Sequence, residues 1–259
     1  MNLSNKNILI TGASSGIGYE LAKQFAHENC NLILLARRKE ILDSLSQELR
    51  TNKNTILTYQ CDIRNKQEVQ NVFSDIRSKI DLIDIAILNS GIGHNITVEN
   101  FDSKFADETF QVNVLGMIYC IEELLKDFLP KKNGIIVGIS SIADVRGFPR
   151  SGIYCASKAA VSTMLESFRV ELIPYNIKVI TVRPGWVTTP MIKKNDFKMP
   201  FLMEAERAAR IIKTGIKKEK KIIEFPIGTV LGGRLLKILP NFIFDYLAAK
   251  GLPKAESKS

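Results

Sequence analysis

Tyr154 and Lys158 are the two side chains of this 259-residue sequence best suited to proton transfer. They lie four residues apart in a segment with helical spacing, so both side chains project from one face of the expected helix. A free tyrosine has a pKa of about 10 and exchanges protons poorly at neutral pH. A nearby ammonium favours tyrosinate, so Lys158 is expected to lower the pKa of Tyr154. Tyr154 could then protonate an alkoxide formed from a carbonyl, or deprotonate an alcohol in the reverse direction.

A glycine-rich turn after the first apolar run could hold a phosphate. The segment Asn7–Glu20 reads NILITGASSGIGYE, with Gly12, Gly16 and Gly18 between an expected strand and an expected helix. A phosphate at a helix N-terminus needs backbone with no Cβ in its way, and free N–H groups at the positive end of the dipole. Three glycines at a strand-to-helix turn supply both, although glycine at such turns often serves only to turn the chain.

The end of the second apolar run predicts which nucleotide is bound. Turns that bind NAD place an acidic residue about 20 residues beyond the glycines, where it accepts from the ribose 2′-hydroxyl. This chain has Ala36 instead, followed by Arg37 and Arg38. A guanidinium fork suits a 2′-phosphate, and a helix start is unfavourable for cations that have no such partner. The pattern favours NADP(H), and two solvated arginines are the plain alternative.

The glycine-rich turn, TGASSGIG, resembles that of the short-chain dehydrogenase/reductase family. Further family motifs follow in family order: Leu88–Gly91 (LNSG) stands where the family has NNAG, Tyr154–Lys158 matches YxxxK, and Pro184–Thr189 matches PGxVxT. Family members with the Ala-Arg-Arg pattern after the second strand generally prefer NADP, which agrees with the argument from charge. Two departures are the LNSG motif itself and Ser15, which stands where a second basic residue is usual.

The resemblance implies a catalytic set of Asn113, Ser141, Tyr154 and Lys158. Ser141 would offer its hydroxyl to the substrate oxygen, and Asn113 would hold a water behind Lys158 in a proton relay. The aspartate after the third strand would lie beside the adenine ring, and the PGxVxT loop would hold the nicotinamide. The residues expected to bind the cofactor are Gly12, Ser14, Ser15, Gly16, Ile17, Gly18, Arg37, Arg38, Asp62, Ile63, Asn89, Gly91, Tyr154, Lys158, Pro184, Gly185, Val187 and Thr189.

Alternating strands and helices must position these residues. Short runs rich in Ile, Leu and Val predict buried strands at Asn7–Ile10, Asn31–Ala36, Thr55–Tyr59, Ile83–Leu88, Gly134–Ile139 and Lys178–Val182. Helical spacing predicts helices at Tyr19–Glu28, Glu40–Arg50, Lys66–Lys79 and Phe105–Leu129. This alternation predicts an α/β fold, a single doubly wound Rossmann domain whose parallel sheet has helices on both faces.

The C-terminal segment departs from that rhythm. We expect the catalytic domain to span residues 1–226, with a last helix at Ala205–Lys218 and a last strand at Lys221–Phe225. Residues 227–259 would form an apolar and basic helical extension. Pro240 should split it into two short helices, with Asn241 as the N-cap of the second and Gly251 closing it. This extension could cap the substrate pocket, pack against a partner subunit, or lie in a membrane interface.

Charge and composition narrow the function classes. The net charge is +9, of which residues 193–259 carry +8, so an anionic surface is a candidate partner for that segment. The basic residues are not interleaved with aromatic ones and no nucleic-acid motif accompanies them, which argues against nucleic acid. Four scattered cysteines and two histidines give neither a zinc site nor a disulfide framework. With no apolar leader, a cytoplasmic protein is expected.

The leading hypothesis is an NADP(H)-dependent oxidoreductase that moves a hydride between nicotinamide and a carbonyl or secondary alcohol, on a hydrophobic or lipid-like small molecule. The alternative is a non-catalytic NADP(H)-binding regulator or scaffold, although such proteins tend to lose the tyrosine or the lysine. A sugar epimerase or dehydratase of the family's extended branch fits poorly, because those proteins carry GxxGxxG and a longer C-terminal domain. Family members mostly form homodimers or homotetramers, which the resemblance implies here too.

Overall fold

Runs of Ile, Leu and Val form a seven-stranded parallel sheet in this computed structural model, which describes residues 1–192 and 199–250. The strands are β1 (Asn7–Thr11), β2 (Asn31–Ala36), β3 (Ile56–Gln60), β4 (Ile85–Leu88), β5 (Gly134–Ile139), β6 (Ile177–Pro184) and β9 (Ile222–Phe225). A small second sheet, which periodicity does not predict, pairs β7 (Val187–Thr188) with β8 (Met203–Glu204). The α-helices are α1 (Gly16–Ala26), α2 (Lys39–Leu49), α3 (Lys66–Lys79), α4 (Lys104–Phe110), α5 (Gly116–Lys131), α6 (Gly152–Glu171), α7 (Ala205–Lys217), α8 (Ile227–Ile238) and α9 (Asn241–Ala249).

The strand order places the glycine-rich turn at the centre of one sheet edge. The order is β3-β2-β1-β4-β5-β6-β9, and β1 pairs in parallel with both β2 and β4. The chain therefore builds outward from β1 in one direction and then returns to build in the other. In such sheets ligands bind beyond the carboxyl ends of the strands, where the order reverses. The predicted doubly wound α/β fold is confirmed.

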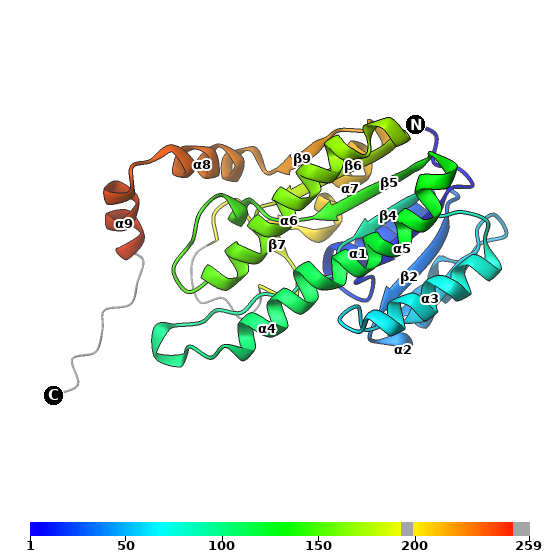
Figure 1. Cartoon of the computed structure of the whole chain (residues 1–259), viewed down its shortest axis with the longest axis horizontal. Helices are drawn as coiled ribbons and strands as arrows, with labels where there is room; N and C mark the ends of the chain where they lie inside the picture. The colour runs from blue at the N-terminus through cyan, green and yellow to red at the C-terminus, as the bar shows by residue number, and fades with distance from the viewer. Residues whose placement is uncertain (193–198, 251–259) are drawn as a thin grey trace.

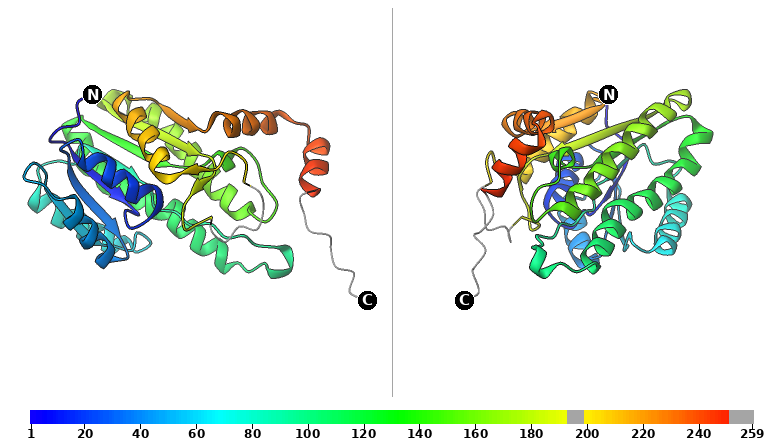
Figure 2. Two further views of the ribbon diagram at one scale, coloured as in Figure 1. Left: turned by 180° about the vertical axis from the view of Figure 1, so that it is seen from behind. Right: turned by 60° about the vertical axis from the view of Figure 1, so that its left-hand side comes forward.

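Each face of the sheet has its own hydrophobic core. Helices α1, α2 and α7 cover one face with side chains such as Phe25, Leu45 and Ile212. Helices α3, α5 and α6 cover the other with side chains such as Phe73 and Phe128. Figure 1 shows α3, α5 and α6 in front of the sheet, and the view from behind in Figure 2 shows α1 and α7. The apolar strands are therefore buried from both sides, which explains their continuous hydrophobic runs.

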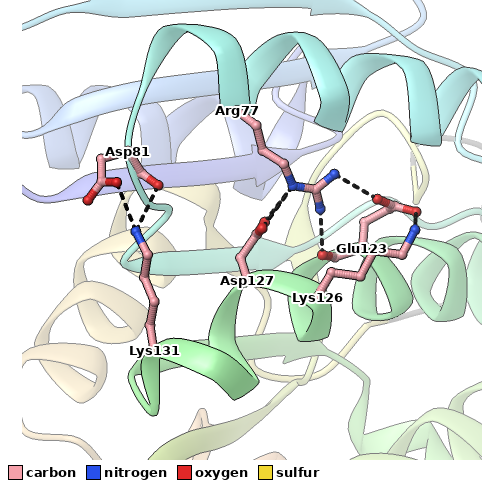
Figure 3. A network of polar contacts seen from close by, with 6 residues as sticks. All are labelled: Arg77, Asp81, Glu123, Lys126, Asp127 and Lys131. Atoms are coloured by element: carbon pink, nitrogen blue, oxygen red, sulfur yellow. Dashed lines mark hydrogen bonds and ion pairs between the residues drawn. The ribbon is translucent and has the colours of Figure 1, made fainter.

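A polar network joins α3 to α5 along their outer edge (Figure 3). Arg77 on α3 donates to Asp127 and to the buried Glu123 on α5, with N···O distances of 2.8 and 3.0 Å. Lys131 at the end of α5 pairs with Asp81 at 2.9 Å. Glu123 is only 2% exposed and pairs with Lys126 as well, so losing Arg77 would remove one of the two cations that balance this buried carboxylate. These contacts hold α5 in place on the sheet.

The helix expected at Phe105–Leu129 is interrupted. Helix α4 leads into a π-helical turn, η2 (Gln111–Leu115), before α5 begins at Gly116. A π turn inserts an extra residue into the helical repeat, and such turns are frequent at functional sites. Apolar periodicity continues across it, which is why one long helix is the natural expectation from sequence.

The C-terminal helices α8 and α9 form an arm that projects beyond the edge where the strands end (Figures 1 and 2). Pro240 separates them as expected, but Asn241 is the first residue of α9 and its amide oxygen accepts from Arg146 instead of capping the helix. Gly251 and the rest of the expected extension to residue 259 lie outside the described residues. Within residues 1–192 and 199–250, no helix is long and apolar enough to cross a membrane.

The four cysteines are buried free thiols. Cys30 precedes β2, Cys61 follows β3, and Cys120 and Cys155 lie in α5 and α6. Burial raises the pKa of Cys30 and of Cys61 to about 12. Their role in the fold is that of small apolar side chains.

Candidate active site

The turn between β1 and α1 needs its glycines for two different reasons. Gly12 and Gly16 have φ angles of +67° and +57°, in the left-handed region that favours glycine. Gly18 has ordinary helical geometry, but a Cβ there would lie 2.5 Å from both Asn89 Nδ2 and Gly12 O. The turn therefore folds back on the start of its own helix. A larger residue at position 18 would push the helix away from Gly12 and Asn89.

Thr11 and Asn89 tie this turn to the end of β4. Thr11 Oγ1 accepts from the backbone N–H groups of Asn89 and Ser90 at 3.0 and 3.1 Å. Asn89 Nδ2 in turn donates to the carbonyl of Thr11 at 3.0 Å. The side-chain amide of Asn89 thus joins the ends of β1 and β4, and it supports the glycine-rich turn of the predicted nucleotide site.

The N-terminus of α1 is open to an anion. Its N-cap, Ser15, makes no side-chain hydrogen bond to the helix, and no acidic residue lies in the first turn. The first N–H groups of the helix therefore keep their hydrogen-bonding capacity and their positive dipole end. Ser14 and Ile17 flank the same turn, with Ile17 packed against the core. Glycine backbone and an uncapped helix start are what a pyrophosphate requires, so these residues fit a dinucleotide.

Arg37 and Arg38 differ in what they contact. The guanidinium of Arg38 donates to the Ser14 hydroxyl at 2.9 Å and to the Ser14 carbonyl at 3.2 Å. Arg37 is exposed, and its charge contributes to lowering the pKa of the Asp62 carboxyl, an effect due mainly to a hydrogen bond from Arg64. Arg38 is therefore built into the glycine-rich turn, and Arg37 is the freer of the two cations.

The two residues predicted after β3 face different surroundings. Arg64 holds the Asp62 carboxylate through a fork whose shortest N···O distance is 2.6 Å. Ile63 is buried, and a Cβ added to Gly116 of α5 would lie 2.7 Å from its side chain. The side chain of Ile63 therefore belongs to the core, whereas Asp62 stays partly exposed at the carboxyl edge.

Helix α6 brings Tyr154 and Lys158 to the same edge, where Ser141 follows β5. Lys158 Nζ lies 5.8 Å from the centroid of the Tyr154 ring and donates to the carbonyl of Ile139 at 3.0 Å. Ser141 caps the short 3₁₀ helix η3 (Ile142–Val145), accepting from Ala143 N at 3.1 Å, and forms a hydrogen bond with Tyr154. The predicted Ser–Tyr–Lys set therefore converges in space.

Burial shifts the pKa of both central groups. It raises the pKa of Tyr154 to about 12, against a smaller opposing effect of the Ser141 hydrogen bond. It lowers the pKa of Lys158 to about 8, since the ammonium loses hydration and is 3% exposed. The net pKa of Tyr154 is therefore raised, and not lowered toward the working range as expected from the sequence. The lysine is itself desolvated and directs its N–H toward a backbone carbonyl, so desolvation of the phenol outweighs any help from its charge.

Asn113 sits in the π turn and joins three elements. Its Oδ1 accepts from Ile92 N at 2.8 Å, and its Nδ2 donates to Ile92 O at 2.9 Å and to Ser157 Oγ at 3.0 Å. A Cβ at Gly91 would lie 3.3 Å from Lys158 Nζ and 3.4 Å from Asn113 Oδ1. Gly91 thus lets the chain after β4 pass close to both polar groups. The relay role of Asn113 stays a prediction.

The segment after β6 closes the site on its remaining side. The Pro184 carbonyl faces Ser141 Oγ at 3.5 Å, and Gly185 N donates to Phe225 O at 2.7 Å. Val187 is buried in strand β7, and a Cβ on Gly16 would lie 3.0 Å from the Thr189 methyl. The predicted nicotinamide loop therefore runs directly past the glycine-rich turn.

Sequence reasoning missed the polar side chains that support this set. Ser157 bridges the Asn113 amide and the Tyr154 carbonyl, with a 2.7 Å bond to the latter. Arg183 on β6 joins the buried Asp144, three residues after Ser141, to Glu224 on β9. Ser157 lies inside the YxxxK spacing and could have been noticed there, whereas the partners of Arg183 are brought together only by the fold.

Comparison with known proteins agrees with this geometry. The family model described as short chain dehydrogenase matches residues 6–199. The chain is 30% identical over 225 residues to a fatty acyl-CoA reductase of Acinetobacter baylyi, covering 85% of this chain and 76% of that protein. It is 32% identical over 194 residues to a 3-oxoacyl-(acyl-carrier-protein) reductase of Thermotoga maritima, covering 75% and 79%.

A solved structure shares the fold over nearly the whole chain. A short-chain dehydrogenase from Sphingobium yanoikuyae in complex with NADPH superposes with a TM-score of 0.80 at 24% identity. The match covers 97% of this chain and 98% of that one. The likeness shows the doubly wound architecture.

Proposed function

This chain belongs to the short-chain dehydrogenase family of oxidoreductases, and on that premise we propose that it uses NADP(H) to interconvert a carbonyl and a secondary alcohol. The proposed substrate is a hydrophobic, lipid-like small molecule. Asn113, Ser141, Tyr154 and Lys158 are the proposed catalytic set, at the carboxyl edge of the sheet beside the glycine-rich turn.

The observation that carries the proposal is the burial of Lys158 without a counter-ion. Its side chain is 3% exposed, and among the described residues no carboxylate pairs with it. Lysine is almost never buried in this way for packing alone, because desolvating an ammonium is costly. A strongly shifted lysine pKa beside a tyrosine at the ligand-binding edge of a Rossmann sheet supports a catalytic role.

In the proposed reduction, Tyr154 Oη donates the proton to the substrate oxygen as that oxygen gains negative charge. Ser141 Oγ donates a hydrogen bond to the same oxygen. Lys158 stabilises the tyrosinate that forms, since its buried ammonium lies within 6 Å of the ring and is screened less by water than a surface charge. Asn113 and Ser157 hold the chain after β4 and helix α6 in register, and so keep the lysine in place. When bound, the nicotinamide supplies the hydride.

The preference for NADP(H) is proposed from Arg37 and Arg38. No acidic residue occupies the end of β2, and Arg38 is already directed at the glycine-rich turn through Ser14. The exposed guanidinium of Arg37 is free to meet a 2′-phosphate, for which its planar fork is suited.

The lipid-like substrate is supported by the two acyl-group reductases among the relatives and by the apolar arm beside the site. We also propose that the chain is cytoplasmic, forms a homodimer or homotetramer, and meets an anionic membrane surface through residues of its extension, 227–259. Nucleic acid is not among the proposed partners.

The test is turnover of NADPH with a panel of aldehydes, ketones and 3-oxoacyl thioesters of increasing chain length. We expect consumption that rises with chain length, and a loss of kcat of at least roughly a hundredfold in Tyr154→Phe with NADPH binding retained. Tyr175→Phe, at an exposed tyrosine far from the set, is the matched control. NADPH binding with no turnover across the panel would favour the non-catalytic alternative, and substantial kcat in Tyr154→Phe would assign the proton to another group.

A further inference from the structure

The arm formed by α8 and α9 is attached to the domain through its inner face. Gly233 is the buried residue of α8, and a Cβ there would lie 2.8 Å from Ile142 in η3. Arg234 adds an ion pair with Glu224 of β9 at 2.8 Å. The inner face of α8 thus rests on the segment that directly follows Ser141.

Arg146 holds the junction between the two helices. Its guanidinium donates to the carbonyls of Leu236 and Leu239 at 2.8 and 2.6 Å, which satisfies the C-terminal end of α8. It also donates to Asn241 and lies 4.3 Å from the ring centroid of Phe244 on α9. One side chain, only five residues beyond Ser141, therefore contacts both helices of the arm.

The outer face of the arm is apolar and exposed. On α8, Ile227, Leu231, Leu235 and Ile238 are 77, 60, 57 and 77% exposed. At about 100° per residue they fall within roughly 80° of arc, opposite the face that carries Gly233. On α9 the exposed bulky residues are Phe242, Tyr246 and Leu247, at 74, 62 and 49%. We call these seven side chains the outer stripe.

Cations border the outer stripe. Arg234 and Lys237 lie along one edge of the α8 stripe, and Lys250 lies over the Tyr246 ring at 4.2 Å. Asp245 is the one acidic residue of the two helices. Lysine is depleted at the cores of protein–protein interfaces, whereas bulky apolar residues bordered by lysine, arginine and tyrosine are typical of helices that lie in a membrane interface. Charge and composition therefore favour an anionic lipid surface over a second protein.

We propose that the outer stripe inserts into the headgroup region of an anionic bilayer, with Lys237 and Lys250 meeting the lipid phosphates. The arm is too short to cross, so it lies in the surface. Because Arg146 and Gly233 fix the arm against the Ser141 segment, binding holds the carboxyl edge of the sheet near the lipid. This deepens the proposed function by naming a bilayer as the source of the hydrophobic substrate, but the binding itself requires no turnover.

The test is co-sedimentation of the full chain with vesicles of phosphatidylcholine alone and of phosphatidylcholine with phosphatidylglycerol. Leu231→Ser, Leu235→Ser and Ile238→Ser together remove three members of the stripe. The matched control replaces three exposed aliphatic residues elsewhere, Val98, Val170 and Ile173, with serine. We expect wild type and control to bind the anionic vesicles and to be released by salt, and the stripe variant to bind at least roughly tenfold more weakly.

Three results would overturn the proposal. The first is wild-type protein that stays in the supernatant with both kinds of vesicle. The second is equal sedimentation of the stripe and control variants. Equal binding to both kinds of vesicle contradicts the anionic requirement. If wild type does not bind vesicles, a change of oligomeric state in the stripe variant assigns the face to a second copy, and a raised KM for a water-soluble substrate assigns it to a lid. A protein that binds vesicles but turns over no carbonyl would refute the proposed reaction and leave this inference standing.

Discussion

At the scale of single residues, the burial of Lys158 lowers the stability of the folded protein. Its pKa falls from an ordinary 10.5 to about 8 because the folded chain withdraws its ammonium from water. A shift of that size corresponds to about 3 kcal/mol of stability lost whenever the folded lysine is charged. The fold tolerates this cost at a position for which we propose a role in proton transfer.

Replacing Lys158 by methionine should therefore stabilise the protein while abolishing most of its turnover. At pH 7 the lysine is charged in both the folded and the unfolded chain. The free energy of unfolding of Lys158→Met should therefore exceed that of wild type by about 2–3 kcal/mol. Between pH 8 and 10.5 the unfolded lysine binds a proton that the folded one has lost, so wild-type stability rises with pH and the difference shrinks. Urea unfolding of both proteins across pH 7–10.5 measures this, and a difference that does not change with pH would contradict it.

The two arginines after β2 give a prediction on cofactor choice. Arg37→Asp combined with Arg38→Ala removes both cations and offers a carboxylate to a ribose hydroxyl. We expect NADPH affinity to fall at least roughly tenfold while NADH binding is retained or improves. Titration by fluorescence measures both affinities. Wild-type protein that binds NADH as tightly as NADPH would refute the NADP(H) assignment.

Sequence alone could predict the residues whose chemistry depends on near neighbours. Tyr154 and Lys158 share a helix face and Gly12 to Gly18 form one turn, so spacing is enough to find them. It could not predict the pKa of Tyr154, because the phenol's surroundings come from several elements. Arg146 was missed for the same reason, since its partners lie about 90 residues further along the chain.

At the scale of elements, regular periodicity predicts helices and strands but not the places where they are altered. The register of α4 and α5 looks continuous in sequence, and the π turn that carries Asn113 appears only when backbone hydrogen bonds are formed. The pairing of β7 with β8 has only two residues per strand, too few to show a period. Both features lie beside the candidate site.

The arm gives the prediction at this scale. Arg146→Ala removes the hydrogen bonds to both helices and the contact with Phe244, so α8 and α9 should detach more often. Limited trypsin digestion should cut after Arg234, Lys237 or Lys250 several-fold faster than in wild type, while the rest of the domain stays intact. Arg210→Ala, which removes an exposed pair with Glu206, is the control. Equal cleavage rates would show that Arg146 does not hold the arm.

At the scale of the whole molecule, the alternation of strands and helices predicts a doubly wound parallel sheet, and the structure confirms it. Oligomeric state is harder to predict from sequence, because the same apolar residue can pack against the sheet or against a partner subunit. Apolar residues at helical spacing, Phe110, Val114, Met117 and Ile121, form the stripe expected to pair with a second subunit. Met117 and Ile121 are buried in the core on one face of the sheet, whereas Phe110 is 36% exposed. Only part of that stripe is left to meet another subunit.

We expect the protein to be at least dimeric at micromolar concentration, as the family resemblance implies. Phe110→Glu places a charge on the exposed part of the stripe and should shift the assembly toward monomer, because a lone buried carboxylate is costly. Light scattering on wild type and variant measures the mass, with Phe101→Glu, at an exposed loop phenylalanine, as control. A wild-type mass of one chain would contradict the prediction.

Because the four thiols are buried, the rate at which each one reacts reports how often its part of the fold opens. Alkylating reagents attack the thiolate, and with the pKa of Cys30 and Cys61 raised to about 12 the native chain reacts only when part of it opens. Cys120 reports on α5, and Cys155 reports on the start of α6 beside Tyr154. Timed alkylation followed by mass spectrometry can thus rank the stability of four regions in a single unlabelled sample.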